Sequence, residues 1–90
     1  MTAPAPDTAA FLHALGKRVR LLRLVRGLTQ DQLAQAAGMS RSFVSLVEHG
    51  SHGVDVVRLV RLAAALGLPL TELVDVTASL AGIGITEQVA

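Results

Sequence analysis

The 90-residue chain allows one domain with a single modest core, and the absence of cysteine excludes a disulfide framework and any thiolate metal site. The net charge is only +1, but all eight basic residues lie between positions 17 and 61 beside three acids, whereas residues 62–90 carry three acids and no base. This uneven distribution suits a polyanionic partner on one face, and it suits ordinary solvated helix faces equally well.

Hydropathy gives two further expectations. Hydrophobic residues make up 51% of the chain, but its longest stretch without a charge, residues 76–86, has 11 residues, and a membrane-spanning helix needs about 20. The first ten residues lack the basic segment and apolar run of a secretory signal. We therefore expect a soluble, cytoplasmic protein that does not enter a membrane.

The N-terminal third predicts a short lead and one long helix. Residues 1–8, which include two prolines, are expected to form a disordered lead. Asp7 or Thr8 can cap a helix that runs to Arg26, and Gly27 follows as its stop. The apolar residues of this helix recur at helical spacing, and they are Phe11 or Leu12, Leu15, Val19, Leu22 and Val25.

Two shorter helices follow. A Thr-x-x-Gln capping box that begins at Thr29 predicts a helix over residues 30–37. Ser40 can cap a third helix over residues 41–49. A glycine follows each of these helices and predicts its end; the two are Gly38 and Gly50.

The next segment predicts two more helices and a tail. Asp55 can cap a fourth helix that stops at Gly67, and its predicted core residues are Val56, Leu59, Val60, Ala63 and Leu66. Pro69 and Thr71 introduce a fifth helix holding Leu73 and Val74. Residues 77–90 form a tail, either as an extension of helix over 71–81 that Gly82 stops, or as a short strand around Ile83 and Ile85.

The second and third predicted helices meet the packing rules of a helix-turn-helix, in which one short helix crosses another at a steep angle. The motif needs a small residue where the two helices touch, a glycine in the turn, and an apolar residue after that glycine to fill the core. Ala34, Gly38 and Met39, in that order, meet these three requirements. The inward positions are apolar, namely Leu33, Ala37, Val44 and Val47. The outward positions of the third helix are polar except Leu46; they are Ser40, Arg41, Ser42, Ser45, Leu46 and His49.

The run LTQDQLAQAAGMSRSFVSLVEHG (residues 28–50), followed by LVRLAAALGLPLTEL (residues 59–73), resembles the phage repressor/Cro-type helix-turn-helix DNA-binding family. The resemblance covers about residues 16–75. It implies an all-α, five-helix repressor-like domain over residues 9–76, whose third helix enters the major groove N-terminus first.

The resemblance also implies roles for individual residues. Base readers are expected at Arg41, Ser42, Ser45 and Leu46, of which Leu46 offers only apolar contact, for example to a thymine methyl. DNA-backbone contacts are expected at Gln30, Ser40, Arg23, His49 and Ser51.

Several residues keep two readings. Arg23 and Glu48 match a family ion pair, which either orients Arg23 beside a phosphate or only fixes the fold. Phe43 either packs under the DNA backbone or shields the core, and Leu46 is either a reader or a dimer or core residue. The four basic side chains of the first helix, other than Arg23, cannot all face DNA, and most should be solvated charges; they are Lys17, Arg18, Arg20 and Arg26.

These features predict a dimeric transcriptional regulator, a repressor, that reads palindromic half-sites of double-stranded DNA about one helical turn (~34 Å) apart. The fifth helix and residues 77–90 are the expected dimer interface. The alternatives are an antitoxin-type protein whose tail binds a toxin, and a restriction-modification controller protein. Glu48, His49 and His52 only loosely resemble a metal cluster, so we expect no catalytic site, metal or cofactor.

Overall fold

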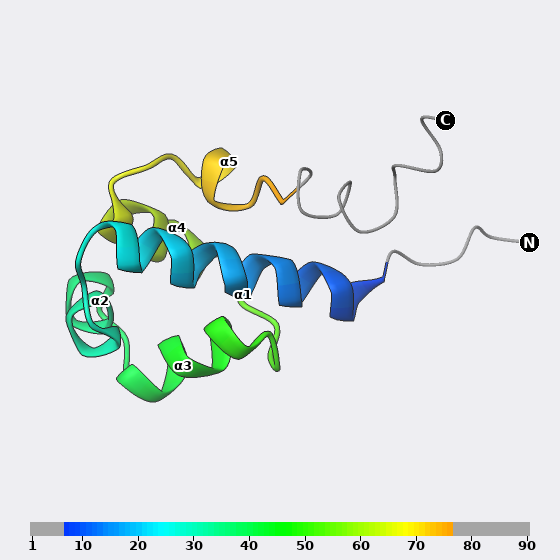
Figure 1. The fold of residues 1–90 in the computed structure, drawn as a ribbon, viewed down its shortest axis with the longest axis horizontal. Helices are drawn as coiled ribbons and strands as arrows, with labels where there is room; N and C mark the ends of the chain where they lie inside the picture. The colour runs from blue at the N-terminus through cyan, green and yellow to red at the C-terminus, as the bar shows by residue number, and fades with distance from the viewer. Residues whose placement is uncertain (1–6, 77–90) are drawn as a thin grey trace, which may run out of the picture.

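The computed structural model describes residues 7–76, and this part of the chain forms five helices and no strand. The predicted all-α, five-helix fold is therefore confirmed. In Figure 1 the long α1 runs across the middle of the molecule, with α3 on one side of it and α5 on the other. The helices are α1 (Thr8–Val25), α2 (Gln30–Ala37), α3 (Arg41–His49), α4 (Val56–Leu66) and α5 (Leu70–Leu73).

The predicted helix caps are confirmed. Asp7, rather than Thr8, caps α1 by accepting the Ala10 N–H at 3.1 Å. Thr29 and Gln32 form the complete capping box of α2. Ser40 and Asp55 cap α3 and α4 in the same way, each accepting an N–H three residues later at 3.1 and 2.9 Å. Each such cap stabilises a helix by about 1 kcal/mol, and together they fix where these helices begin.

The core is built from aliphatic side chains of all five helices. The inward positions predicted for α2 and α3 are buried, as is Ala34, which is 1% exposed between them. Met39 is half-buried and packs against this core from the turn, as its predicted role in filling the core requires. The largest fully buried side chains are Leu15, Val19, Leu33, Val44, Val47, Leu62, Leu66 and Leu73.

Two predicted core residues of α4, and the last residue of the apolar series in α1, are exposed instead. Val25, Val56 and Val60 are 72%, 66% and 47% exposed. Val25 is the last residue of α1 and lies beyond the packed part of that helix. In α4 only Arg58 and Arg61 mark a polar side, so spacing does not decide which of the flanking apolar residues are buried. The helix packs against α2 and α5, and Leu62 is buried rather than Val56 or Val60.

The fifth helix is shorter than its longest predicted form. Pro69 occupies the N-cap position of α5 without a side-chain capping bond, and the helix ends at Leu73, with Val74 at its C-cap position. A continuous helix over 71–81 is therefore wrong for residues 74–76, although Val76 is still buried against the core. The alternatives for the tail, with Gly82, Ile83 and Ile85, lie outside the described residues, as do positions 1–6 of the predicted lead.

One glycine allows α1 and α3 to approach more closely than their side chains suggest. A Cβ on Gly16 would lie 2.5 Å from the carbonyl oxygen of Val47 and 2.6 Å from that of Glu48. These are backbone atoms of α3, so they cannot rotate away. The backbones of the two helices are therefore in contact at this point, and α3 is held close along the middle of α1.

We expect Gly16→Ala to lower the free energy of unfolding by about 2 kcal/mol, because the added methyl forces the two backbones apart. This expected loss is the net value, after the roughly 1 kcal/mol of helix propensity that alanine gains over glycine has offset part of the strain. Urea unfolding measures the difference. Gly53→Ala is the matched control, since a Cβ there has no atom within 4 Å. Equal stability of the two variants would contradict the close approach.

Candidate nucleic-acid interface

The turn between α2 and α3, residues 38–40, sets α3 across α2. As a result one side of α3 packs against the core and the other side is open. Val44 and Val47 are fully buried on the inner side. On the outer side Arg41, Ser42 and His49 are exposed, Leu46 is 37% exposed and Ser45 is half-buried. The predicted base readers therefore share the open side of one helix.

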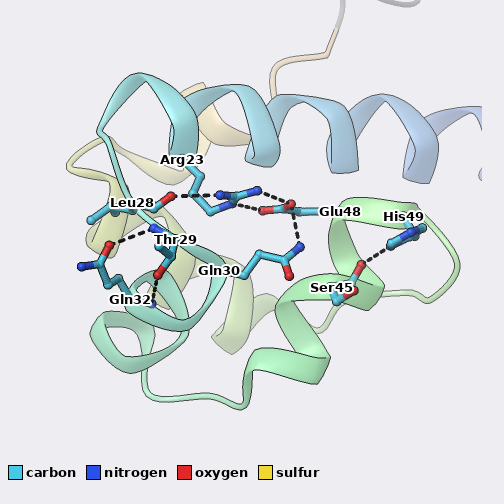
Figure 2. A network of polar contacts seen from close by, with 8 residues as sticks. All are labelled: Arg23, Leu28, Thr29, Gln30, Gln32, Ser45, Glu48 and His49. Carbon is cyan, nitrogen blue, oxygen red and sulfur yellow. Dashed lines mark hydrogen bonds and ion pairs between the residues drawn. The ribbon is translucent and has the colours of Figure 1, made fainter.

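The predicted Arg23–Glu48 ion pair is present, and it joins α1 to α3. Arg23 Nε donates to Glu48 Oε2 at 2.6 Å, and Nη2 donates to Oε1 at 3.0 Å. Arg23 Nη1 donates to the carbonyl of Leu28 at 2.9 Å, and Gln30 Nε2 donates to Glu48 Oε1 at 3.1 Å. Figure 2 shows the side chains from α1, α2 and α3 converging on this carboxylate.

This network is buried, which bears on the two readings of Arg23. The side chains of Arg23 and Glu48 are only 9% and 3% exposed. The hydrogen bond to Glu48 raises the pKa of the Arg23 guanidinium above its ordinary value, so Arg23 stays charged. Every terminal nitrogen of Arg23 already has an acceptor, and little of its surface remains for a phosphate. The fold-fixing reading accounts for all of these contacts.

An open hollow of 340 Å³ lies beside the ion pair, between α1 and the helix-turn-helix. Arg20, Gln30, Glu48 and His49 line it. His49 Nδ1 lies 2.8 Å from the carbonyl oxygen of Ser45; a carbonyl only accepts, so this bond places the proton on Nδ1. The hollow thus gathers an arginine, an amide and an imidazole next to the outer side of α3.

Arg20 lines this hollow, although the sequence predicted no separate role for it among the basic residues of α1. Tertiary contacts distinguish it from the neighbouring arginines. Arg18 Nε donates to the carbonyl of Glu72 at 2.7 Å and ties α1 to α5. The Arg26 guanidinium lies at the C-terminal end of α4, where it would contact a Cβ on Gly67 at 2.8 Å. No spacing rule within α1 separates these three arginines, since their contacts lie on other helices.

The other predicted contact residues have local structural tasks. Ser40 Oγ accepts the Phe43 N–H, and Ser51 Oγ donates to the carbonyl of Leu46 at 3.3 Å, so the two hydroxyls close the two ends of α3. Both residues are exposed. Phe43 is half-buried and packs against the core, and the Arg58 guanidinium covers its ring at 4.8 Å from the centroid.

Residues 7–76 contain neither a candidate metal site nor a helix that could cross a membrane. No three histidine or carboxylate side chains there are grouped so that they could hold a metal ion. No helix in the same range is long and apolar enough to cross a membrane.

We expect Glu48→Gln to lower the free energy of unfolding by about 3 kcal/mol, because it leaves the Arg23 charge buried without its counter-ion. Urea unfolding at neutral pH measures this loss. Asp55→Asn is the control, since it removes an exposed ion pair but keeps a side chain that caps helices well, and it should cost less than about 1 kcal/mol. Equal losses would show that the Arg23–Glu48 pair contributes no more than a surface pair.

Comparison with known proteins agrees with this geometry. The sequence profile of the family described as "Helix-turn-helix domain" matches residues 14–76. A hypothetical transcription factor of Neisseria meningitidis is 33% identical over 75 residues, which cover 81% of this chain and 71% of that protein. The immunity repressor of Bacillus phage phi105 is 35% identical over 60 residues, 67% of this chain but only 42% of the repressor.

A solved structure gives the same result in three dimensions. The restriction-modification controller protein C.AhdI of Aeromonas hydrophila superposes with a TM-score of 0.68 at 42% identity, over 69% of this chain and 94% of C.AhdI. Residues 14–76, which match the family profile, contain the turn, the buried sides of α2 and α3, and the helices that support them. The chain therefore belongs to the repressor-type helix-turn-helix family of DNA-binding transcription regulators.

Proposed function

We propose that this protein is a cytoplasmic, sequence-specific binder of double-stranded DNA that acts as a homodimer and represses transcription, with α3 in the major groove. The observation that carries the proposal is the outer side of α3. It presents Arg41 and Ser42 in the first turn of a helix whose other side is locked into the core. A rigid helix with polar side chains at its exposed N-terminus is the arrangement that major-groove reading requires.

The proposed base contacts follow from the chemistry of each side chain. The planar guanidinium of Arg41 can donate to O6 and N7 of one guanine, a contact that gives about 1–3 kcal/mol of discrimination. Ser42 and Ser45 can donate to or accept from base edges on the next positions. Leu46, 37% exposed, offers an apolar surface to a thymine methyl.

The proposed phosphate contacts lie around the hollow and at the two ends of α3. Gln30 and His49 stay on this list, and Arg20 joins them because it lines the same hollow. Ser40 and Ser51 each keep a hydroxyl at an exposed position. Arg23 acts indirectly: through Glu48 it orients the Gln30 amide, which is the outermost member of the buried network.

Dimerisation and repression are proposed from general arguments. A single recognition helix contacts few bases, so two copies on half-sites about one helical turn (~34 Å) apart are needed for useful affinity. Leu73 of α5 is fully buried inside the protomer, so only the outward residues of this helix and the tail, residues 77–90, remain for the expected interface. The similarity to an immunity repressor supports repression.

A second candidate within the same fold is a restriction-modification controller protein. The observation that favours it is the 42% identity to C.AhdI over 94% of that chain. The antitoxin alternative depends on residues 77–90, which lie outside the described part of the chain.

We expect the protein to prefer the DNA just upstream of its own gene over a shuffled duplex by about 10³-fold at physiological salt. Fluorescence anisotropy with both duplexes measures the preference, and titration at low salt provides the comparison. Weak binding to both duplexes that collapses as salt rises would leave only nonspecific electrostatics and contradict the proposal for this DNA.

We expect Arg41→Ala to lose about 1–3 kcal/mol of preference at one base pair of each half-site while keeping its affinity for shuffled DNA, because it removes a base contact. The same titrations with operator variants locate that base pair. Gln30→Ala is the contrast, since loss of a phosphate contact weakens binding to all sequences alike. A uniform loss in Arg41→Ala would show that Arg41 does not read bases.

A further inference from the structure

The first turn of α4 carries an arginine that lies against the first turn of α3. The guanidinium carbon of Arg58 is 4.8 Å from the centroid of the Phe43 ring, a distance at which a cation is attracted to an aromatic face. Arg58 Nη1 also donates to Asp55 Oδ2 at 2.6 Å. The side chain of Arg58 is nevertheless 49% exposed.

Two neighbours restrain the Arg58 side chain but leave some of its hydrogen-bond donors available. Hydrogen bonds from the Arg58 N–H and side chain hold the pKa of the Asp55 carboxyl below its usual value, so Asp55 remains ionised and keeps its hold on Arg58. Within residues 7–76, Arg58 Nε and Nη2 donate to no protein acceptor. The guanidinium thus has free donors on a side chain that two neighbours already restrain, which lowers the entropy lost on binding.

The position of Arg58 relative to α3 sets what it can meet. An α-helix with its side chains is 10–12 Å across, and the major groove is about 12 Å wide, so a docked helix fills the groove. A cation that lies beside the first turn of α3, but on another helix, is therefore outside the groove. The walls of the groove are phosphates, so a phosphate is the group such a cation meets.

We propose that Arg58 is a phosphate-binding residue that contacts the DNA backbone beside the bases met by the first turn of α3. The Phe43 ring packs against one face of the Arg58 guanidinium. The free Nε and Nη2 of Arg58 donate to the phosphate oxygens. Asp55 holds the side chain in the free protein and opposes the phosphate by its charge. This inference rests on the proposed function, since it places α3 in the groove.

The test compares Arg58→Ala with Arg26→Ala, both analysed on the full chain by anisotropy over a series of salt concentrations. Arg26 is also an exposed arginine, but its guanidinium lies at the opposite end of α4, beside Gly67. The two variants therefore have the same net charge, and they differ only in the position at which one positive charge has been removed. Thermal melting checks that both remain folded, as the loss of exposed contacts predicts.

We expect Arg58→Ala to weaken binding to native and shuffled duplexes by the same factor, about tenfold, and to reduce the slope of log K against log salt by about 1 per protomer. Arg26→Ala should leave both unchanged. Arg58→Lys should keep the slope, because it keeps the charge. Asp55→Asn, which keeps a good helix cap, should tighten binding.

Three outcomes would overturn the inference. If Arg58→Ala weakened DNA binding but left the salt slope unchanged, Arg58 would only position α3 through Phe43. Equal losses in Arg58→Ala and Arg26→Ala would mean that total charge, not this site, sets the affinity. A parent protein that binds neither duplex would overturn the inference together with the proposed function, whereas the first two outcomes leave the proposed function standing.

Discussion

The buried ion pair between Arg23 and Glu48 is the interaction on which the position of α3 depends. Removing two charges from water costs several kcal/mol for each ion, and the pair is stable only because its geometry is good and its remaining groups are satisfied. Here the carboxylate receives two bonds from Arg23 and one from Gln30, and Arg23 also donates to the Leu28 carbonyl. A displaced α3 would leave a buried charge unpaired, so the network favours one arrangement of α1, α2 and α3.

Close packing restricts the same helix from a second direction. Gly16 lets the backbone of α1 contact that of α3, and Val44 and Val47 fill the space beneath. These β-branched side chains have few rotamers, so the core has little freedom to let α3 rotate. The side of α3 that faces outward is then fixed by what the core holds on the inner side. In this way the aliphatic core determines which polar residues are presented to a partner.

The arginines illustrate how one residue type takes different tasks in one small domain. Arg23 is buried and joins helices, Arg18 binds a carbonyl of α5, and Arg20 lines an open hollow. Arg58 is restrained on an aromatic ring but stays half exposed. Net charge therefore says little about this surface. What distinguishes the arginines is whether a neighbouring helix supplies an acceptor for the guanidinium.

Local sequence signals were enough to predict where α1 to α4 begin and end, and which sides of α2 and α3 are buried. Caps and terminal glycines act over three or four residues, so their signals are complete within a short window. The pairing of Arg23 with Glu48 was also predictable, but only through the resemblance to a known family.

Which face of α4 is buried depends on its packing against the other helices, because Val56 and Val60 are as apolar as Leu62 and spacing alone cannot rank them. The need for glycine at position 16 was equally hidden, since it arises from a backbone contact with α3. The tasks of the arginines were undetermined for the same reason: the partners of Arg23 and Arg18 lie 25 and 54 residues away in the chain. Local rules set the helices of this protein, and long-range contacts set what their surfaces can do.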